Sequence, residues 1–351
     1  MTNGPLRAFP GWLPRLALCL ASGLAGLMTA APAAAGASAV FVMYHRFGED
    51  NIPATNIRID QFEAHLEELA TGGYTVLPVP DIIAALRAGE ALPDKAVGIT
   101  IDDAYASVYA EAWPRLRAAG FPFTLFVSTD PVDRGGRGYM TWDQVREMAA
   151  AGVTIGHHGA AHAHMAYADA ETNAADIANA SRRFEDELGS VPGLFAYPFG
   201  EYSRALRDMV AGAGFTAAFG QQSGGAHGDG DMFTLPRFAL NERWGEPDRF
   251  RFVAQILPLP VTDVTPSDPL LGPNPPAFGF TVAEDLDDLD RLNCFDAAGE
   301  RTVVVERLGA YRIEMRIDGP FPPGRARINC TLPAPEGRYR WFGIQFLIPE
   351  R

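Results

Sequence analysis

Cysteine is scarce in this chain. The 351 residues include only Cys19, Cys294 and Cys330. None of them lies near the polar clusters described below, so a catalytic thiol is excluded there. If the N-terminal segment is removed on export, Cys294 and Cys330 remain, and an even number of cysteines in an exported chain allows a disulfide between them.

Basic residues are also few. Lys95 is the single lysine among 29 basic residues, which face 43 acidic residues and give a net charge of −14. A chain with this charge repels nucleic acids and anionic membranes. We therefore expect no nucleic-acid partner. A cationic partner would be tolerated, although solubility alone accounts for the charge.

The N-terminus lacks an apolar run of membrane-spanning length. The run over 16–28 is shorter than the ~20 residues that cross a bilayer, and glycine and alanine dilute it. Arg7 and Arg15 precede this run and small residues ending at Ala35 follow it, which is typical of a secretory signal peptide. We expect residues 1–35 to be cleaved and the mature protein to be secreted or periplasmic, without stable membrane insertion. A membrane anchor is the alternative.

The sequence does contain a repeated unit, in which a helix-patterned stretch and a glycine precede a short apolar run. Apolar runs cover 40–44, 74–77, 97–101, 121–127, 153–155, 194–197 and 215–219. The expected helices cover 61–70, 82–88 and 142–150, with Asp60, Asp81 and Thr141 as their N-caps. Strands that alternate with helices predict an α/β fold with a parallel sheet, here a distorted TIM-like (β/α)7 barrel over residues 36–260.

The pattern changes after residue 260. Prolines are dense over 261–274, and we interpret this stretch as a linker. Beyond it, short β-rich runs separated by glycine or proline turns cover 301–306, 311–317, 325–331 and 339–348. They predict a small β-sandwich domain over 275–351, within which Cys294 and Cys330 could form the disulfide.

Polar residues follow four of the predicted strands. They are His45, the pair Asp102 and Asp103, the pair His157 and His158, and the turn 198–200. Because the C-terminal ends of parallel strands meet on one face of a barrel, these four segments should converge there. Each of them alone could be an ordinary loop or surface feature.

Two imidazoles and a carboxylate in this group suit a metal ion. His158 and His162 are four residues apart, a spacing that favours chelation, and four of the seven histidines fall within 157–164. Two histidines and one carboxylate leave coordination positions open for water and substrate, as a catalytic zinc or similar divalent site requires. Asp102 and Asp103 point to opposite sides of a strand end, so they can take different roles.

These segments resemble a known family. The matching motifs, in order, are Thr100-Ile101-Asp102-Asp103, His158-x-x-x-His162 and Tyr197-Pro198-Phe199-Gly200. They are similar to the three leading motifs of the polysaccharide deacetylase (NodB-homology) family, over about residues 38–260. Within that family, Val42-Met43-Tyr44-His45 resembles the poly-β-1,6-N-acetylglucosamine deacetylases, whose motifs occur in permuted order.

The resemblance implies a metal-dependent hydrolase that removes N-acetyl groups from an N-acetylglucosamine-containing polysaccharide. Asp103, His158 and His162 would bind one divalent metal ion per chain, with Zn²⁺ expected and Ni²⁺ or Co²⁺ as alternatives. Asp102 would be the general base and His45 the general acid. The backbone N–H of Phe199 would stabilise the oxyanion. His227 is a second candidate for the acid.

Other residues are candidates for substrate contact. They are Tyr105, Pro198, Tyr202, Arg237 and Trp244, with Trp142 and Tyr167 as further aromatic residues near the predicted site. Each aromatic ring could instead pack against the barrel, since large aromatic residues are mostly buried. Arg237 is also expected to contact Asp102.

The chain departs from the family pattern at several positions. Ala104 replaces the usual glycine after the Asp pair, Gly159 replaces a small polar residue, and no arginine precedes Pro198. The later Asp-x-x-Trp and Leu-x-His motifs are not evident. Two alternatives therefore remain: a catalytically silent glycan-binding protein on this fold, or a hydrolase of a non-sugar amide or an O-acetyl ester. Because the C-terminal domain carries none of the motifs, a chain ending near Val261 should keep activity.

Overall fold

The computed structural model describes residues 1, 4, 37–283, 286 and 288–350. The predicted signal peptide therefore lies almost entirely outside the described residues. Among the residues that are described, helices with the length and apolar character of a membrane span are absent.

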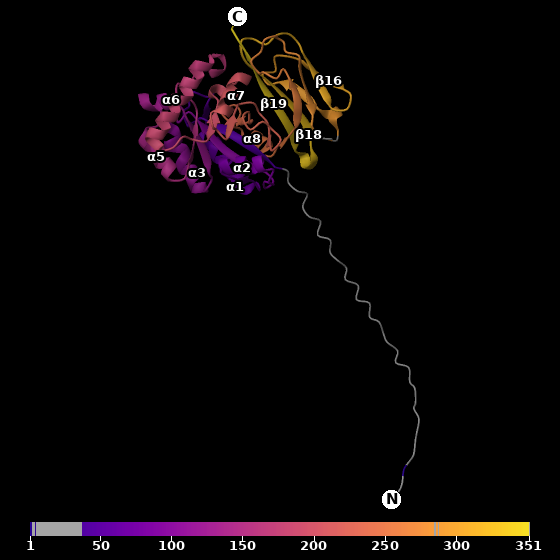
Figure 1. The fold of residues 1–351 in the computed structure, drawn as a ribbon, viewed down its shortest axis with the longest axis horizontal. Coiled ribbons are helices and arrows are strands. Elements are labelled where there is room, and N and C mark those ends of the chain that lie inside the picture. Colours follow the sequence, from indigo (N-terminus) through magenta and orange to yellow (C-terminus); the bar gives the residue numbers. More distant parts are fainter. Residues whose placement is uncertain (2–3, 5–36, 284–285, 287, 351) are drawn as a thin grey trace. The chain divides into compact units, whose positions relative to one another are not determined.

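The central sheet is parallel along most of its width, as expected for an α/β fold. In Figure 1 helices surround this part of the chain, and the C-terminal strands form a β-rich region beside it. Its strands follow the order β10–β1–β5–β6–β7–β8–β9, with β4 beside β5 and β11 beside β1. The bounds are β1 Ser38–Tyr44, β4 Thr75–Val76, β5 Ala96–Asp102, β6 Phe123–Val127, β7 Thr154–His157, β8 Leu194–Ala196, β9 Ala217–Phe219, β10 Ala226–His227 and β11 Phe238–Ala239. Only β10 pairs antiparallel among these.

The two edges of this sheet are connected by the segment 235–239. Leu235 lies alongside β9. Its N–H donates to Ala218 O at 2.9 Å, and Gly220 N donates to Leu235 O at 3.0 Å. A few residues later, β11 pairs with β1. The sheet is therefore curled, and the C-terminal ends of its parallel strands lie along one rim.

Helices α1 to α8 connect these strands. Their bounds are α1 Ile59–Thr71, α2 Val79–Ala88, α3 Trp113–Ala119, α4 Thr129–Arg134, α5 Trp142–Ala150, α6 Ala170–Leu188, α7 Arg204–Gly212 and α8 Pro247–Ala254. Short β2 (Arg46–Phe47) pairs with β3 (Asn56–Ile57), and single helical turns cover 108–112, 165–167, 198–200, 289–291 and 335–337.

The predicted helix starts were right in one case and wrong in two. Thr141 caps α5, where its hydroxyl accepts from Gln144 N at 3.3 Å. Asp60 and Asp81 instead lie inside the first turns of α1 and α2, which begin at Ile59 and Val79. An acidic residue in a first helical turn interacts favourably with the helix dipole, so the same side chains stabilise starts that lie two residues earlier in α1 and three residues earlier in α2.

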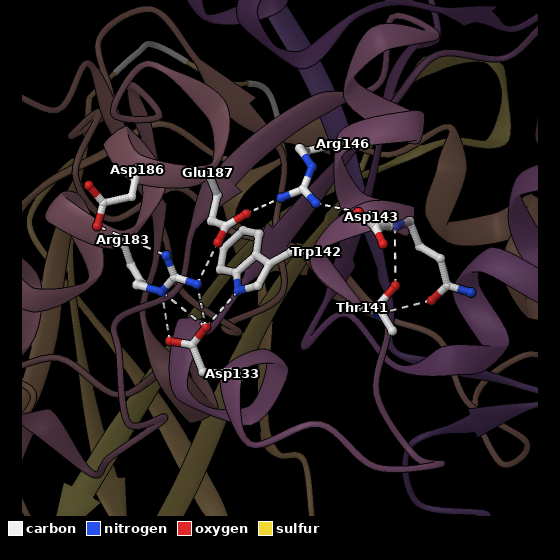
Figure 2. Close-up of polar contacts among 9 residues, drawn as sticks. Asp133, Thr141, Trp142, Asp143, Arg146, Arg183, Asp186 and Glu187 are labelled. Carbon is white, nitrogen blue, oxygen red and sulfur yellow. Dashed lines mark hydrogen bonds and ion pairs between the residues drawn. The ribbon is translucent and has the colours of Figure 1, made fainter.

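Helices α5 and α6 are joined by a polar network (Figure 2). Trp142 Nε1 donates to Asp133 Oδ1 at 2.7 Å, and Arg183 Nε donates to both oxygens of Asp133 at 3.0 and 2.9 Å. Arg146 pairs with both Asp143 and Glu187. Trp142, considered above as a sugar contact, is buried in this packing.

The C-terminal region forms two four-stranded sheets. One has the order β12–β19–β18–β15 and the other β13–β14–β17–β16. The bounds are β12 Leu257–Pro258, β13 Val261–Thr265, β14 Phe278–Val282, β15 Asn293–Asp296, β16 Val303–Leu308, β17 Arg312–Ile317, β18 Gly324–Pro333 and β19 Tyr339–Ile348. Both sheets contribute to one buried apolar cluster, which includes Phe278 and Phe346 at 5.3 Å between ring centroids.

The predicted disulfide is present in this region. Cys294 in β15 lies opposite Cys330 in β18, and the two sulfur atoms are bonded. The stretch interpreted as a linker begins with a strand, because β13 over 261–265 pairs with β14. The prolines that suggested a linker, Pro266 and Pro269 among them, follow this strand in the loop.

Candidate active site

Asp103, His158 and His162 converge at the rim of the central sheet. One potential ligand atom from each lies within 4.8 Å of the others. Asp103 Oδ1 is 3.3 Å from His158 Nε2 and 3.0 Å from His162 Nε2. This oxygen is buried but lacks a hydrogen bond of acceptable geometry. A buried carboxylate oxygen without a hydrogen bond, facing two imidazole nitrogens, fits a divalent cation.

Two strand ends position this cluster. Asp103 directly follows β5. Asp103 has a φ of 76° and Ala104 a φ of 53°, so both residues adopt the left-handed backbone conformation. Such angles are rare for residues other than glycine and often mark functional sites. The alanine that replaces the family's glycine therefore keeps a glycine-like backbone. His157 ends β7 and is buried against Phe195, so its neighbour His158 points to the cluster.

His158 is oriented by the next strand. Its Nδ1 lies 2.7 Å from Ala196 O, where only a protonated nitrogen can donate to the carbonyl. That bond places a proton on Nδ1 and directs Nε2 at Asp103. A histidine that ligates a metal commonly donates its second nitrogen in this way. The residues present thus fit a site with two nitrogen ligands and one oxygen ligand.

Asp102 is paired with Arg237. Nη1 and Nη2 of Arg237 donate to the two oxygens of Asp102 at 2.7 and 2.8 Å, and both side chains are fully buried. Arg237 is itself held by Gly220 O at 3.0 Å. Burial alone would raise the pKa of Asp102, but the Arg237 guanidinium outweighs it and holds the pKa below its usual value. Asp102 is therefore a carboxylate of fixed orientation beside the cluster.

The predicted contact between Arg237 and Asp102 is confirmed. The prediction that Arg237 contacts the sugar directly is wrong. Arg237 has no exposed surface, so it cannot contact a sugar. The segment 235–239 runs inside the sheet, where the side chain points inward.

Replacement of Arg237 by methionine should strongly destabilise the fold. It would leave Asp102 as a buried charge without its partner, which typically costs about 3–5 kcal/mol. Urea unfolding measures the loss. Arg251→Met provides the control, because Arg251 forms an exposed ion pair with Glu68 and should change little. Equal losses in the two variants would contradict the structural importance of the buried pair.

His45 follows β1 at the same rim. It interacts electrostatically with Asp103, Asp102 and His158. Burial lowers the pKa of His45, and the two carboxylates partly oppose this shift. A lower pKa makes the imidazolium a stronger acid but reduces the fraction that is protonated near neutral pH.

His227, the second candidate acid, is at the wrong end of the sheet. It pairs with Ser38 at the start of β1, whereas His45 follows the end of that strand. Seven residues of β-strand span about 20 Å. The glycine-rich sequence around His227 gave no indication of this antiparallel pairing.

The turn Pro198–Gly200 also borders the cluster. Phe199 has a φ of 59°, and its ring centroid is 4.5 Å from that of His162. His164 stacks on the Phe199 ring, with 4.0 Å between the ring centroids, and its Nδ1 is 2.7 Å from Glu201 Oε2. Sequence analysis missed His164 and Glu201, although both directly neighbour the motifs.

The remaining candidates for substrate contact lie in different places. Tyr105 is half-buried under the Arg46 guanidinium, 3.3 Å from its ring centroid, and Pro198 is buried. Tyr202 lines a cavity of about 300 Å³ together with His227 and Trp341, and none of the three metal-ligand candidates lines it. Trp244 contacts two arginines, Arg243 and Arg249. Sugar contacts by these residues stay predictions.

Known proteins provide independent comparisons. Residues 89–218 match the polysaccharide deacetylase family. The chain is 25% identical over 200 residues to YxkH of Bacillus subtilis (strain 168), a protein named for the same family, covering 57% of this chain and 70% of that protein. It is also 25% identical over 245 residues to the poly-β-1,6-N-acetyl-D-glucosamine N-deacetylase of Escherichia coli (strain K12), covering 58% of this chain and 36% of that protein. The chain thus spans about a third of the length of this second relative.

Solved structures agree on the fold. The deacetylase PplD of Streptococcus pyogenes, in complex with acetate, superimposes with a TM-score of 0.57 at 21% identity, covering 62% of this chain and 98% of that one. IcaB from Ammonifex degensii gives a TM-score of 0.53 at 25% identity, with 62% and 97% coverage. The family match includes Asp102, Asp103, His158 and His162, and its motifs meet at one rim of the sheet. The chain therefore contains a domain of the polysaccharide deacetylase family, over residues 89–218.

Proposed function

We propose that this protein is a metal-dependent hydrolase that removes N-acetyl groups from an N-acetylglucosamine-containing polysaccharide. The observation that carries the proposal is the cluster of Asp103, His158 and His162, beside a carboxylate, Asp102, that Arg237 holds in place. The E. coli relative, which is named as an N-deacetylase of this polymer, supports the choice of substrate class.

Each residue then has a defined task in the cleavage of the amide. Asp103, His158 and His162 would hold a divalent cation, which would supply Lewis-acid polarisation of the acetyl carbonyl and activation of water. Asp102 accepts the proton that the attacking water loses. The Phe199 N–H donates to the oxygen that becomes negative. His45 protonates the nitrogen as the carbon–nitrogen bond breaks, which releases acetate and a free amine.

The same proposal includes a secreted or periplasmic location and a barrel followed by a β-sandwich. A disulfide between Cys294 and Cys330 is compatible with an oxidising compartment, where the expected signal peptide would send the chain. The linked edges of the central sheet support barrel closure, and the shared apolar cluster supports the sandwich. Zn²⁺ is the proposed metal because nitrogen and oxygen ligands suit it.

Acetate release from defined oligomers tests the function. N-acetylglucosamine oligomers of β-1,6 and β-1,4 linkage, an O-acetylated sugar and a simple N-acetyl amide would each be incubated with the purified protein and Zn²⁺. We expect the β-1,6 oligomer to be the best substrate. Preference for the ester or the simple amide would indicate the alternative hydrolase, and binding of oligomers without acetate release would indicate a silent glycan-binding protein.

The identity of the acid can be tested with two histidines of the same domain. His45→Ala should lower kcat by ~10² or more, the usual effect of removing a general acid, while metal content stays normal. His227→Ala should keep activity, because His227 lies at the opposite end of β1. Full activity of His45→Ala would remove His45 from the mechanism.

A further inference from the structure

The turn that carries Phe199 has a strained backbone. Phe199 has a φ of 59°, in a region that residues other than glycine rarely adopt. Gly200 follows with a φ of 66°, and a Cβ at this position would lie 2.5 Å from Gln221 N. Such a conformation persists only where its surroundings hold it.

Gln345, in β19 of the C-terminal region, holds this turn from outside the central sheet. Its Nε2 donates to Gly200 O at 3.0 Å and to Phe199 O at 3.4 Å. Its Oε1 accepts from Arg327 Nε at 2.8 Å. Because arginine can only donate, this bond assigns the two ends of the amide and directs the Nε2 toward the turn. The side chain is 2% exposed, so the contacts are shielded from water.

Arg325, in β18, contacts the same turn. Its Nη1 donates to Phe199 O at 3.3 Å, and its guanidinium carbon is 5.8 Å from the Phe199 ring centroid. Its Nε is 3.6 Å from Glu201 Oε1. Glu201 is buried and also interacts with His164, whose ring stacks on Phe199. The turn is thus contacted by C-terminal strands as well as by its own domain.

These strands are fitted closely to the deacetylase domain. Gly343 approaches the loop after β9 so closely that a Cβ would lie 2.3 Å from Ser223 O. Trp341 is buried in the same apolar cluster as Phe238 and Phe250, which belong to the deacetylase domain. The position of Gln345, two residues beyond Gly343, is therefore fixed relative to the turn.

We infer that the C-terminal sheet is part of the active-site framework, in which Gln345 and Arg325 are positioning residues that hold the Pro198–Gly200 turn against His162. The catalytic consequence rests on the proposed function. The expectation that a chain ending near Val261 keeps activity is reversed, because that chain would lack both positioning residues and Trp341.

The test compares two substitutions of Gln345 with a control on another strand. Gln345→Ala removes the donor and the volume. Gln345→Glu keeps the volume and the partner Arg327 but presents an acceptor to the two carbonyl oxygens. Arg316→Ala is the control, because Arg316 is exposed in β17 and pairs with Glu306. Arg325→Ala provides a second route if a Gln345 variant fails to fold.

Amide hydrogen exchange of peptides covering 197–203 is the first measurement, and it needs no substrate. Both Gln345 variants and Arg325→Ala should exchange faster in this segment than wild type or Arg316→Ala. Kinetics on the β-1,6 oligomer is the second measurement. We expect kcat to fall ~10- to 10²-fold, as small misplacements in an active site can cause, with KM and zinc content nearly unchanged.

Gln345→Glu separates positioning from space filling. A side chain that only fills space would leave this variant like wild type in both measurements, and that result would overturn the inference. Unchanged exchange in every variant would overturn it too, as would faster exchange without any loss of kcat. If wild type releases no acetate from any substrate, the proposed function fails. The exchange data still decide whether Gln345 and Arg325 hold the Pro198–Gly200 turn.

Discussion

His158→Ala is expected to abolish both metal binding and acetate release. The substitution removes one of three ligand atoms, and it also breaks the bond from Nδ1 to Ala196 O that orients the ring. Asp103 and His162 would remain with too few ligands to hold a divalent cation tightly. Metal content of the purified variant, measured by elemental analysis beside acetate release, checks the expectation.

His227→Ala is the matched control for this variant. It removes an imidazole from the same domain at the other end of β1, so metal content and activity should both persist. A His158→Ala protein that keeps one metal ion per chain would show that the cluster is not the metal site.

Asp102→Asn should separate catalysis from metal binding. The amide has nearly the same shape and can still accept from Arg237 through its oxygen, but it cannot accept a proton from water. We expect kcat to fall by ~10² to 10⁴, the usual effect of removing a general base, with metal content near that of wild type. Asp103→Asn should instead lose the metal, because its Oδ1 faces both imidazoles.

Thermal melting must accompany these measurements. Asp102 and Arg237 form a fully buried ion pair, so Asp102→Asn leaves a buried guanidinium without its charged partner. A lower melting temperature is expected, and kinetics should be measured well below it. If Asp102→Asn loses the metal while Asp103→Asn keeps it, the roles of the two residues are exchanged.

Features with a local signature could be predicted from the sequence. The Thr141 cap was visible because a threonine and a glutamine three residues later form a capping box. The convergence of Asp103 with His158 followed from a general property of parallel sheets, whose strand ends share one rim. The disulfide was inferred from cysteine number and export, and the pairing of β15 with β18 places it.

Contacts that depend on tertiary register could not be predicted. The sequence of β19 does not show which segment Gln345 contacts, because its partner turn is 145 residues away. The position of His227 could not be predicted for the same reason, since loop composition does not determine which end of a sheet a segment reaches. The starts of α1 and α2 were shifted because an acidic residue suits a first turn as well as a cap.

The central claim is that the cluster of Asp103, His158 and His162 binds a divalent metal on which N-deacetylation depends. The direct measurement is a titration of chelated protein with Zn²⁺, followed by acetate release from the β-1,6 N-acetylglucosamine oligomer. Activity should be absent without metal, rise in proportion to added Zn²⁺ and level off near one ion per chain. Full activity in the chelated protein, with metal content verified as zero, would contradict the claim.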